Sequence, residues 1–592
     1  MTGLVRWLAA DGGAEDIDER TYRLALALTA VVAVLLRMLF PLADPPWQMS
    51  VGVVWHDEGA WTHNARNMAL FGTWETDRWN PMYLAPVFTA LEYASFRAFG
   101  VGLWQARFVP EILGAASVLF LAGAVRHAAG RAAGALAGAL ASVHFVWVMW
   151  NRAALLETPM VVPMVAALYA CARGARAGGW RAAAWGASAG ACAVIAFFAK
   201  AAAAFFLPAL GVVALAGLWR WHVAPADARA AERSDLAHRG VILGLLLAGA
   251  TALVVFVIPF WSEFRFYNWQ MSVTRKPSYA WAAFVDRASW LPVVTDFFTR
   301  MWVVLLLAFG AACGVAARWR RAAAAEWLAV AWIVLGCAEL IVHDTGNERR
   351  YVFLIPPLIA LASIALGRDR RLVAPEVAAL TRRQLVAVLP VVLFGFYVLA
   401  GSAARAAFAP HISPSVRSGA AAAALAGAAL AVAWPRPVRW ISSRRWTLRA
   451  SVTLAALVVG LDLAGFVRWS AGRTYHNYRA MRLVGERLAP GTLVHGKLAN
   501  GLALESRIRP VFVGREFGNY EDRLERDDIR YILTYTRPYL GYEGRVILDV
   551  LGATAWTVVE RFPVAESPAG NDEAALIEKL PRAGSGTPAE RR

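Results

Sequence analysis

Cysteine is scarce in this chain, and its placement excludes several kinds of site. Only four cysteines occur in 592 residues, and none belongs to a Cys-x-x-Cys pair. All four fall within apolar runs or at their ends, where cysteine serves as a small buried hydrophobe. A disulfide scaffold and a cysteine-based metal centre are therefore not expected. The four are Cys171, Cys192, Cys313 and Cys337.

Lysine and acidic residues are also in short supply, and the chain has arginine and long apolar runs instead. The net charge is +18, 58% of residues are hydrophobic and the mean hydropathy is +0.46. Apolar runs of about 15 to 20 residues are typical of a polytopic helical membrane protein. Most of the excess arginine lies between these runs, where it orients helices across the bilayer. We therefore expect membrane lipids, and not nucleic acid, as a partner.

The apolar runs predict about thirteen transmembrane helices. With residues 1–23 as a cytoplasmic N-terminus and the first helix as a retained signal anchor, all the inner connections are basic. Counting residues 81–100 as a span would place those arginines outside, so this segment is predicted to lie at the outer interface with Glu92 and Arg97 toward water. The predicted spans are 24–42, 109–125, 133–150, 156–172, 182–198, 201–219, 241–260, 301–316, 328–342, 351–366, 385–400, 420–434 and 452–466.

The chain changes character after the last apolar run. Residues 469–592 alternate short β-like runs with helical stretches such as 478–488, which predicts a soluble α/β domain on the periplasmic or extracellular side of the inner or plasma membrane. The expected fold is thus mainly α, with a transmembrane domain at 24–468 that includes an outer loop at 44–106. The predicted strands are 492–494, 511–513, 530–534, 545–550 and 555–559.

Asp57 and Glu58 form an acidic pair shortly after the first apolar run. Adjacent residues on a helix diverge by about 100°, so the two carboxylates are not expected to point at one atom. One would be the reactive carboxylate, and its neighbour would be a structural or substrate contact. The alternative is a solvated pair at a helix N-terminus, favoured by the helix dipole.

Further charged groups stand at the outer ends of later helices. Glu157 follows Arg152 and precedes a proline, so it is either a site carboxylate or a simple helix start. Lys200 is one of only four lysines and lies between aromatic residues and a run of alanines. Its ammonium group should face a cavity, a carboxylate or a phosphate, unless it snorkels to the interface.

A later turn adds two adjacent guanidinium groups. Arg349 and Arg350 suit a bidentate phosphate clamp, or else they belong to a solvated turn. His56, His63 and His343 fall near carboxylates on the same side, so a divalent metal is a possible ligand, although the spacing matches no recognisable motif. The candidate metal ligands are Glu157, His56 and His343. Outward-facing carboxylates beside cations at the membrane surface suit a lipid-phosphate substrate.

In these residues the chain resembles the GT-C membrane glycosyltransferases of the protein O-mannosyltransferase and lipid A aminoarabinose transferase type. The likeness covers roughly residues 50–370 and is looser beyond them. Its motifs are Asp57-Glu58, Asn80-Pro81-Met82-Tyr83, Phe96 to Gly100, Ala106 to Pro110, Asn151-Arg152 with Glu157-Thr158-Pro159, Ala199-Lys200-Ala201 with Leu207-Pro208, and Arg350-Tyr351 with Pro356-Pro357.

The resemblance implies that a sugar passes from a polyprenyl-phosphate donor to a hydroxyl of a protein, lipid or glycan at the outer face. Asp57 would be the general base, with Glu58 and Glu157 as further carboxylates of the site. No cofactor is implied beyond the divalent metal considered above. The implied donor-phosphate ligands are Lys200, Arg349, Arg350 and Arg152, and the implied substrate contacts are Arg78, Asn80, Tyr83 and Tyr351.

The chain departs from this family at specific positions. Asn80-Pro81 stands where relatives that modify lipid A tend to carry Lys-Pro, so a cationic role there would pass to Arg78. Glu157 stands where relatives often have Asp, which moves the carboxylate by one methylene. No inserted β-trefoil module interrupts the helices, which favours a bacterial inner-membrane enzyme over a eukaryotic-type protein mannosyltransferase.

Two other functions compete with the transferase. A transporter or lipid flippase would place its charges near the bilayer midplane, often in repeated halves. Here the notable charges gather at the outer ends of helices, and the sequence shows no internal repeat. A noncatalytic factor of envelope assembly would tolerate Asp57→Asn, whereas a transferase would not.

Overall fold

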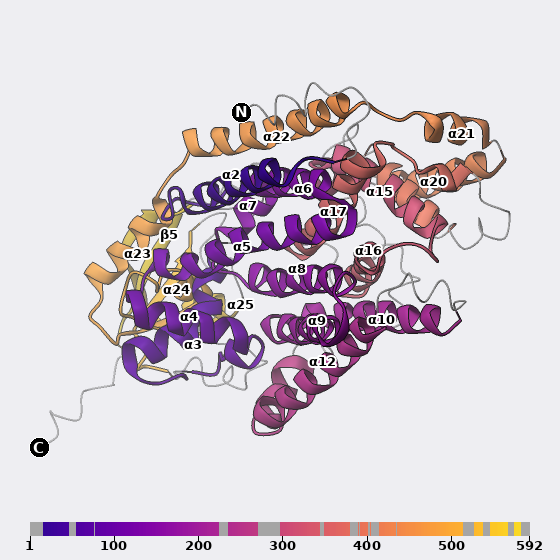
Figure 1. Ribbon diagram of the computed structural model, residues 1–592. Helices are drawn as coiled ribbons and strands as arrows, with labels where there is room; N and C mark the ends of the chain where they lie inside the picture. The colour runs from indigo at the N-terminus through magenta and orange to yellow at the C-terminus, as the bar shows by residue number, and fades with distance from the viewer. Residues whose placement is uncertain are drawn as a thin grey trace, which may run out of the picture.

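The computed structural model is mainly helical, with a small sheet near the C-terminus (Figure 1). Long helices run side by side across the molecule, and the sheet lies at one end of them beside α3 (Asp57–Phe71) and α4 (Pro86–Phe99). The described residues are 16–46, 55–75, 77–223, 235–269, 296–343, 348–378, 389, 391–400, 403, 414–433, 435–512, 526–536, 545–565 and 573–581.

The first half of the helical domain begins with α2 (Glu19–Met38), whose N-terminus is capped by Asp18 accepting a hydrogen bond from the Thr21 amide at 2.7 Å. Such a cap satisfies one of the amides that a helix start leaves unpaired. The other elements up to residue 223 are the 3-10 turn η1 (Pro81–Tyr83), α5 (Leu103–Ala129), α6 (Arg131–Val143), α7 (Phe145–Asn151), α8 (Glu157–Gly174), α9 (Gly179–Ala199), the 3-10 turn η2 (Ala201–Phe205) and α10 (Phe206–Val223).

The second half completes the bundle and ends in α22, which packs against α6 and α7. Its elements are α12 (Leu236–Ala252), η3 (Leu253–Val257), α13 (Trp261–Arg265), α14 (Asp296–Thr299), α15 (Trp302–Ala317), α16 (Ala324–His343), η8 (Glu348–Leu354), α17 (Ile355–Ile364), η9 (Ala365–Asp369), α18 (Pro375–Ala378), α20 (Pro414–Ala433), α21 (Pro435–Ser443) and α22 (Leu448–Ala471).

Large aliphatic side chains on the outer faces of these helices are exposed. Contact between such side chains and water is unfavourable. On α2, Leu24 is 60% and Leu28 64% exposed. A bilayer would cover such faces. Within the described ranges, seven helices are long and apolar enough to cross a membrane, or eight if the bent pair α6 and α7 forms one span. Three shorter apolar helices accompany them, and the predicted total of about thirteen stays a prediction.

The structure breaks one predicted span and refines another segment. The apolar run 133–150 bends by 61° between α6 and α7, at His144. Residues 81–100 form η1 and α4, and Arg97 is exposed as predicted. The prediction that Glu92 faces water is wrong, because its side chain is fully buried. Helical periodicity alone could not say that α4 packs against α3 and α5.

Helices α9 and α12 make a very close contact that depends on glycine. A Cβ atom on Gly186 would lie 2.0 Å from the carbonyl oxygen of Ala237, and one on Gly244 would lie 2.1 Å from that of Ala187. Small residues let two backbones approach in this way when both helices are surrounded by lipid. The contact fixes the position of α9, which ends next to Lys200.

The arginine-rich connections meet one another at one end of the bundle. Glu326 is buried and pairs with Arg318 at 2.7 Å and with Arg368 at 2.7 Å. Arg220 donates to the carbonyl of Ala322 at 3.1 Å. These contacts bring together the connections that the topology prediction assigned to one side.

A five-stranded sheet forms the centre of the C-terminal region, in the order β2-β1-β3-β5-β4. The three strands β2, β1 and β3 are parallel, whereas β5 runs antiparallel to β3 and β4. The elements are α23 (His476–Arg487), β1 (Leu493–His495), α24 (Lys497–Gly501), β2 (Arg509–Val511), β3 (Tyr531–Tyr535), α25 (Arg545–Ala553), β4 (Trp556–Pro563) and β5 (Glu573–Lys579).

Among the described residues, the predicted α/β character is confirmed, with one wrong strand and one missed strand. Residues 545–550 are helical in α25, because Ile547 and Val550 are spaced to share one buried helix face. β-Branched side chains had favoured a strand there. The strand that sequence reasoning missed is β5. Charged residues stand at both ends of this short strand, and its central residues are buried.

The C-terminal region docks directly on α3. A Cβ atom on Gly59 would lie 1.8 Å from the carbonyl oxygen of Asn500, so only glycine allows this approach. Buried Arg66 donates to the carbonyls of Ala503, Ser506 and Ile508 at 2.8 to 3.0 Å. The helix that begins with Asp57 is thereby held by the C-terminal region.

Candidate active site

Asp57 is the first residue of α3, and its carboxylate meets a cation from the far half of the chain. Its Oδ2 atom is 2.6 Å from Nη1 of Arg349, and its Oδ1 atom is 3.5 Å from Nε2 of His56. The side chain is 13% exposed. The carboxylate is therefore oriented by neighbours but not sealed off.

Glu157 and Lys200 form a second buried pair beside the first. Lys200 donates to Glu157 Oε1, and Nε of Arg349 is 3.5 Å from the same oxygen. Glu157 begins α8, while Lys200 occupies the break between α9 and η2. Arg349 thus links the two carboxylates, Asp57 and Glu157, that the sequence proposed for one site.

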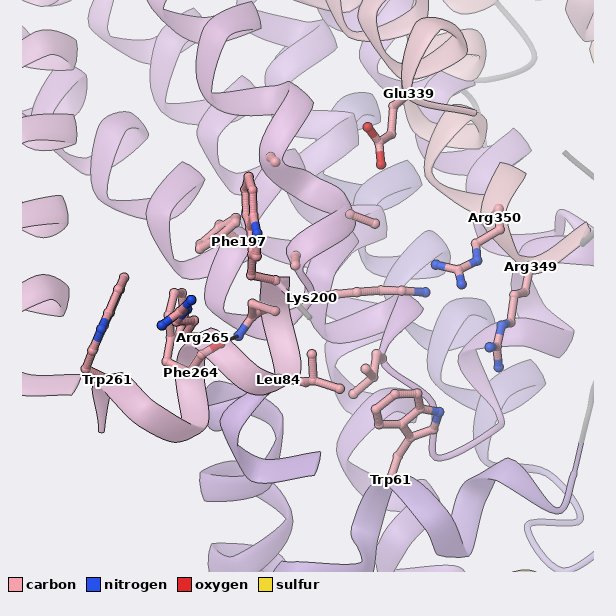
Figure 2. A pocket seen from close by; sticks show the side chains of 16 residues that line it. Trp61, Leu84, Phe197, Lys200, Trp261, Phe264, Arg265, Glu339, Arg349 and Arg350 are labelled. Atoms are coloured by element: carbon pink, nitrogen blue, oxygen red, sulfur yellow. Dashed lines mark hydrogen bonds between the residues drawn. The ribbon is translucent and has the colours of Figure 1, made fainter. Parts of the chain in front are cut away.

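A cavity of about 680 Å³ opens next to these groups (Figure 2). Lys200, Arg349 and Arg350 lie on one side of it, with the Lys200 ammonium group pointing toward the two arginines. Apolar and aromatic side chains form most of the rest, including Phe197 and Phe264. A cavity with a cationic side and a mainly apolar side can bind a molecule that is anionic at one end and apolar at the other.

Trp61 and Glu339 are two of the lining residues that the sequence analysis did not single out. Trp61, one turn along α3 from Asp57, forms part of the wall, and Glu339 of α16 points toward the cavity from above in the view of Figure 2. Glu339 had a signal, because an ionisable residue inside an apolar run is a candidate functional group. Trp61 had none, since tryptophan is frequent throughout this chain.

Glu58 faces away from the cavity and is fully buried. Its carboxylate makes a bidentate pair with Arg107, at 2.8 Å and 2.7 Å, and accepts a third hydrogen bond from the Ala154 amide at 2.9 Å. Arg107 also donates to the carbonyls of Pro41 and Ala43. We call these groups the Glu58–Arg107 cluster; its contacts join the loop after α2 to α3, α5 and the turn before α8.

Arg152 is occupied elsewhere. Its guanidinium group donates to the carbonyls of Leu36 and Phe40 at 3.0 Å and 2.8 Å, at the C-terminal end of α2, and lies 4.6 Å from the Trp469 ring. The structure therefore does not bring it to the other predicted phosphate ligands. A guanidinium group that follows an apolar helix can complete a helix end as well as bind a phosphate.

The predicted substrate contacts around residue 80 form a polar and aromatic cluster near the cavity. The Tyr267 hydroxyl accepts from the Asn80 amide at 2.8 Å and donates to the Arg78 carbonyl at 2.7 Å. The Tyr83 ring stacks on the Tyr267 ring, and its hydroxyl donates to Glu75 at 2.9 Å. Burial raises the pKa of both tyrosines, so both stay protonated donors. The Arg78 side chain itself is exposed.

Of the remaining predicted site residues, some lie at the cavity and others do not. Tyr351 is buried against Phe297 and Phe298 and does not line the cavity. His56 lies beside Asp57, whereas the side chain of His343 falls outside the described residues. Among the residues that the structure describes, no group of three or more His, Cys, Asp and Glu side chains is arranged to hold a metal ion.

Comparison with known proteins concerns the fold. Residues 83–227 match the family model described as dolichyl-phosphate-mannose-protein mannosyltransferase. The fold is similar to that of ArnT from Cupriavidus metallidurans bound to undecaprenyl phosphate, at 18% identity and a TM-score of 0.53, over 93% of this chain and 97% of that one. This chain has an ArnT-like GT-C fold. The resemblance and the fold class expected from the sequence are thereby confirmed.

Two further solved structures are similar to this chain. The apo state of the same ArnT matches equally well, with 18% identity and a TM-score of 0.53 over 94% of this chain and 97% of that one. The S. cerevisiae Pmt1–Pmt2 complex bound to the sugar donor matches at 19% identity and a TM-score of 0.31, over 41% of this chain and 34% of that one. No curated protein matches the sequence. The GT-C fold and the apolar helices make this a multi-pass membrane protein.

Proposed function

We propose that this protein is a membrane glycosyltransferase that moves a sugar from a polyprenyl-phosphate donor to an acceptor hydroxyl of a protein, lipid or glycan. The observation that carries the proposal is the cavity in which three of the four lining cations, Lys200, Arg349 and Arg350, face a mainly aromatic and apolar wall, with Asp57 bound to Arg349. The ArnT structure of similar fold contains undecaprenyl phosphate, a molecule with the same division into anionic and apolar parts.

The donor phosphate would lie against Lys200, Arg349 and Arg350, and the polyprenyl chain would follow the apolar wall toward Phe197 and Phe264. During transfer the bond between the anomeric carbon and the phosphate oxygen breaks. The phosphate then gains a negative charge, which fixed cations in a site with little water stabilise by a few kcal/mol.

Asp57 would act as general base. It takes the proton of the acceptor hydroxyl while that oxygen attacks the anomeric carbon, and a base in hydrogen-bonding reach typically contributes about 10² to 10⁴ in rate. Glu157 would keep Lys200 and Arg349 in place between turnovers. The contacts of Glu58 and Arg152 support structural roles instead, so neither belongs to our proposed site.

Transfer would take place on the periplasmic or extracellular side of the inner or plasma membrane. This location is supported by the contacts among the basic connections at the opposite end of the bundle, because basic connections stay in the cytoplasm. On this topology the cavity cations and the C-terminal region share the outer side.

The test is turnover of the purified, detergent-solubilised protein with labelled polyprenyl-phosphate sugars and envelope extract as acceptor. We expect sugar transfer with release of free polyprenyl phosphate, and a loss of about 10² to 10⁴ in Asp57→Asn with unchanged thermal stability. Glu486→Gln, which changes an exposed carboxylate on α23, is the matched control. Lipid movement without release of polyprenyl phosphate would instead indicate a flippase.

A further inference from the structure

A short chain of polar groups connects the C-terminal region to Asp57. The hydroxyl of Tyr535, in β3, is 3.2 Å from Nδ1 of His56. The other ring nitrogen of His56, Nε2, is 3.5 Å from Oδ1 of Asp57. Since Arg349 binds Oδ2, the two oxygens of this carboxylate face two different side chains.

The Tyr535 contact bears on which nitrogen of His56 carries the proton. A neutral imidazole has one N–H donor and one bare acceptor nitrogen. With the proton on Nδ1, the bare Nε2 would face the carboxylate, and two acceptors would oppose each other. When Tyr535 donates to Nδ1, the proton is on Nε2 and points to Asp57, which is the favourable arrangement.

The backbone around His56 is also set by the C-terminal region. A Cβ atom on Gly501 would lie 2.8 Å from Cβ of His56, so α24 packs against this residue without space. Two turns further along α3, Nδ1 of His63 is 2.9 Å from Oδ1 of Asn500. The start of α3 therefore cannot rotate without moving α24.

We propose that the C-terminal region orients the general base through Tyr535 and His56. His56 is a positioning residue: its Nε2–H orients the Asp57 carboxylate toward the acceptor hydroxyl. This inference rests on the proposed function and gives the C-terminal region a part in the reaction.

The experiment uses the full-length protein in the transfer assay, with kcat and the donor KM measured separately. His56→Leu should lower kcat about 10- to 100-fold, the range for a hydrogen bond to a charged group, with the donor KM within about twofold of wild type. His56→Gln should recover much of this loss, since its amide N–H can take the place of Nε2–H and has no tautomer to fix.

Tyr535→Phe separates this role from simple docking. It should lower kcat about 3- to 10-fold in the wild-type background. In the His56→Gln background it should have no effect, because glutamine does not depend on the tyrosine for its proton. Tyr531→Phe, which removes a hydroxyl from the same strand, is the matched control and should leave kcat unchanged.

An equal loss from Tyr535→Phe in both backgrounds would overturn the inference, and so would wild-type kcat in His56→Leu. If His56→Leu does not fold, the pair of Tyr535→Phe measurements decides alone. Those failures leave the proposed function intact as long as Asp57→Asn is inactive. Equal activity of Asp57→Asn and wild type would overturn the proposed function and, with it, this inference.

Discussion

Asp57 and Glu58 are neighbours in sequence but belong to two different regions of the molecule. Glu58 is fully buried with all its partners in the Glu58–Arg107 cluster, whereas Asp57 is partly exposed and binds Arg349 at a cavity. Each region holds carboxylates against cations. In the first, the charges are satisfied by packed protein and join helices together. In the second, the cations also line the cavity, which a ligand can occupy.

The largest effect expected from the difference between the two regions is on stability. Glu58→Gln leaves the buried charge of Arg107 without its carboxylate, and we expect the free energy of unfolding to fall by about 3 to 5 kcal/mol. Denaturation in detergent measures this, with Asp57→Asn as the control that should change little. The double variant Glu58→Gln, Arg107→Met should recover part of the loss. Wild-type stability in Glu58→Gln alone would show that the two regions do not differ as described.

The next effect concerns ligand binding at the cavity. We expect Lys200→Met combined with Glu157→Gln to weaken binding of polyprenyl phosphate about 10- to 100-fold, because one charged hydrogen bond to the phosphate is lost. The second substitution avoids an unpaired buried carboxylate. Binding of a fluorescent polyprenyl phosphate measures the affinity, and Lys579→Met, in β5, should not alter it. Unchanged affinity in the double variant would remove Lys200 from the site.

The smallest effect sharpens the comparison through Glu92, which is buried on α4 near Glu58. Burial, and then the charge of Glu58, raises the pKa of Glu92 well above its ordinary value. A raised folded-state pKa means that its contribution to stability is complete below the unfolded pKa, near 4.5, and declines as pH rises. The stability of Glu92→Gln relative to wild type should therefore increase from pH 4 to pH 8. A constant difference across that range would contradict the assignment.

The sequence predicted the cavity groups because charges next to apolar runs need partners. Lys200 between aromatic residues and alanines was expected to face a carboxylate, a phosphate or a cavity, and the structure places it beside Glu157 and the cavity. The pairing of Asp57 with Arg349 spans 292 residues; the topology prediction placed both on the outer face, and the family resemblance assigned both to one site.

Other features could not be predicted because they depend on which helix faces meet. The residues alone do not decide whether Asp57 or Glu58 faces the cavity, and only the resemblance pointed to Asp57; the structure pairs Glu58 with buried Arg107 instead. Arg152 had the same local pattern as a phosphate ligand, but its partners are carbonyls at the end of a distant helix. The overall helical fold with a C-terminal sheet was predictable, since long apolar runs and a change of composition are strong local signals.

The contact between Gly59 and the Asn500 carbonyl carries a consequence for how such proteins diverge. Because α3 has no side chain at this point, the fit is between two backbones, and neither partner can be changed independently. A chimaera that joins this transmembrane domain to the C-terminal region of a relative would misplace the helix that carries Asp57. Exchange would succeed only if α3 and the segment around Asn500 were transferred together, as one inherited unit.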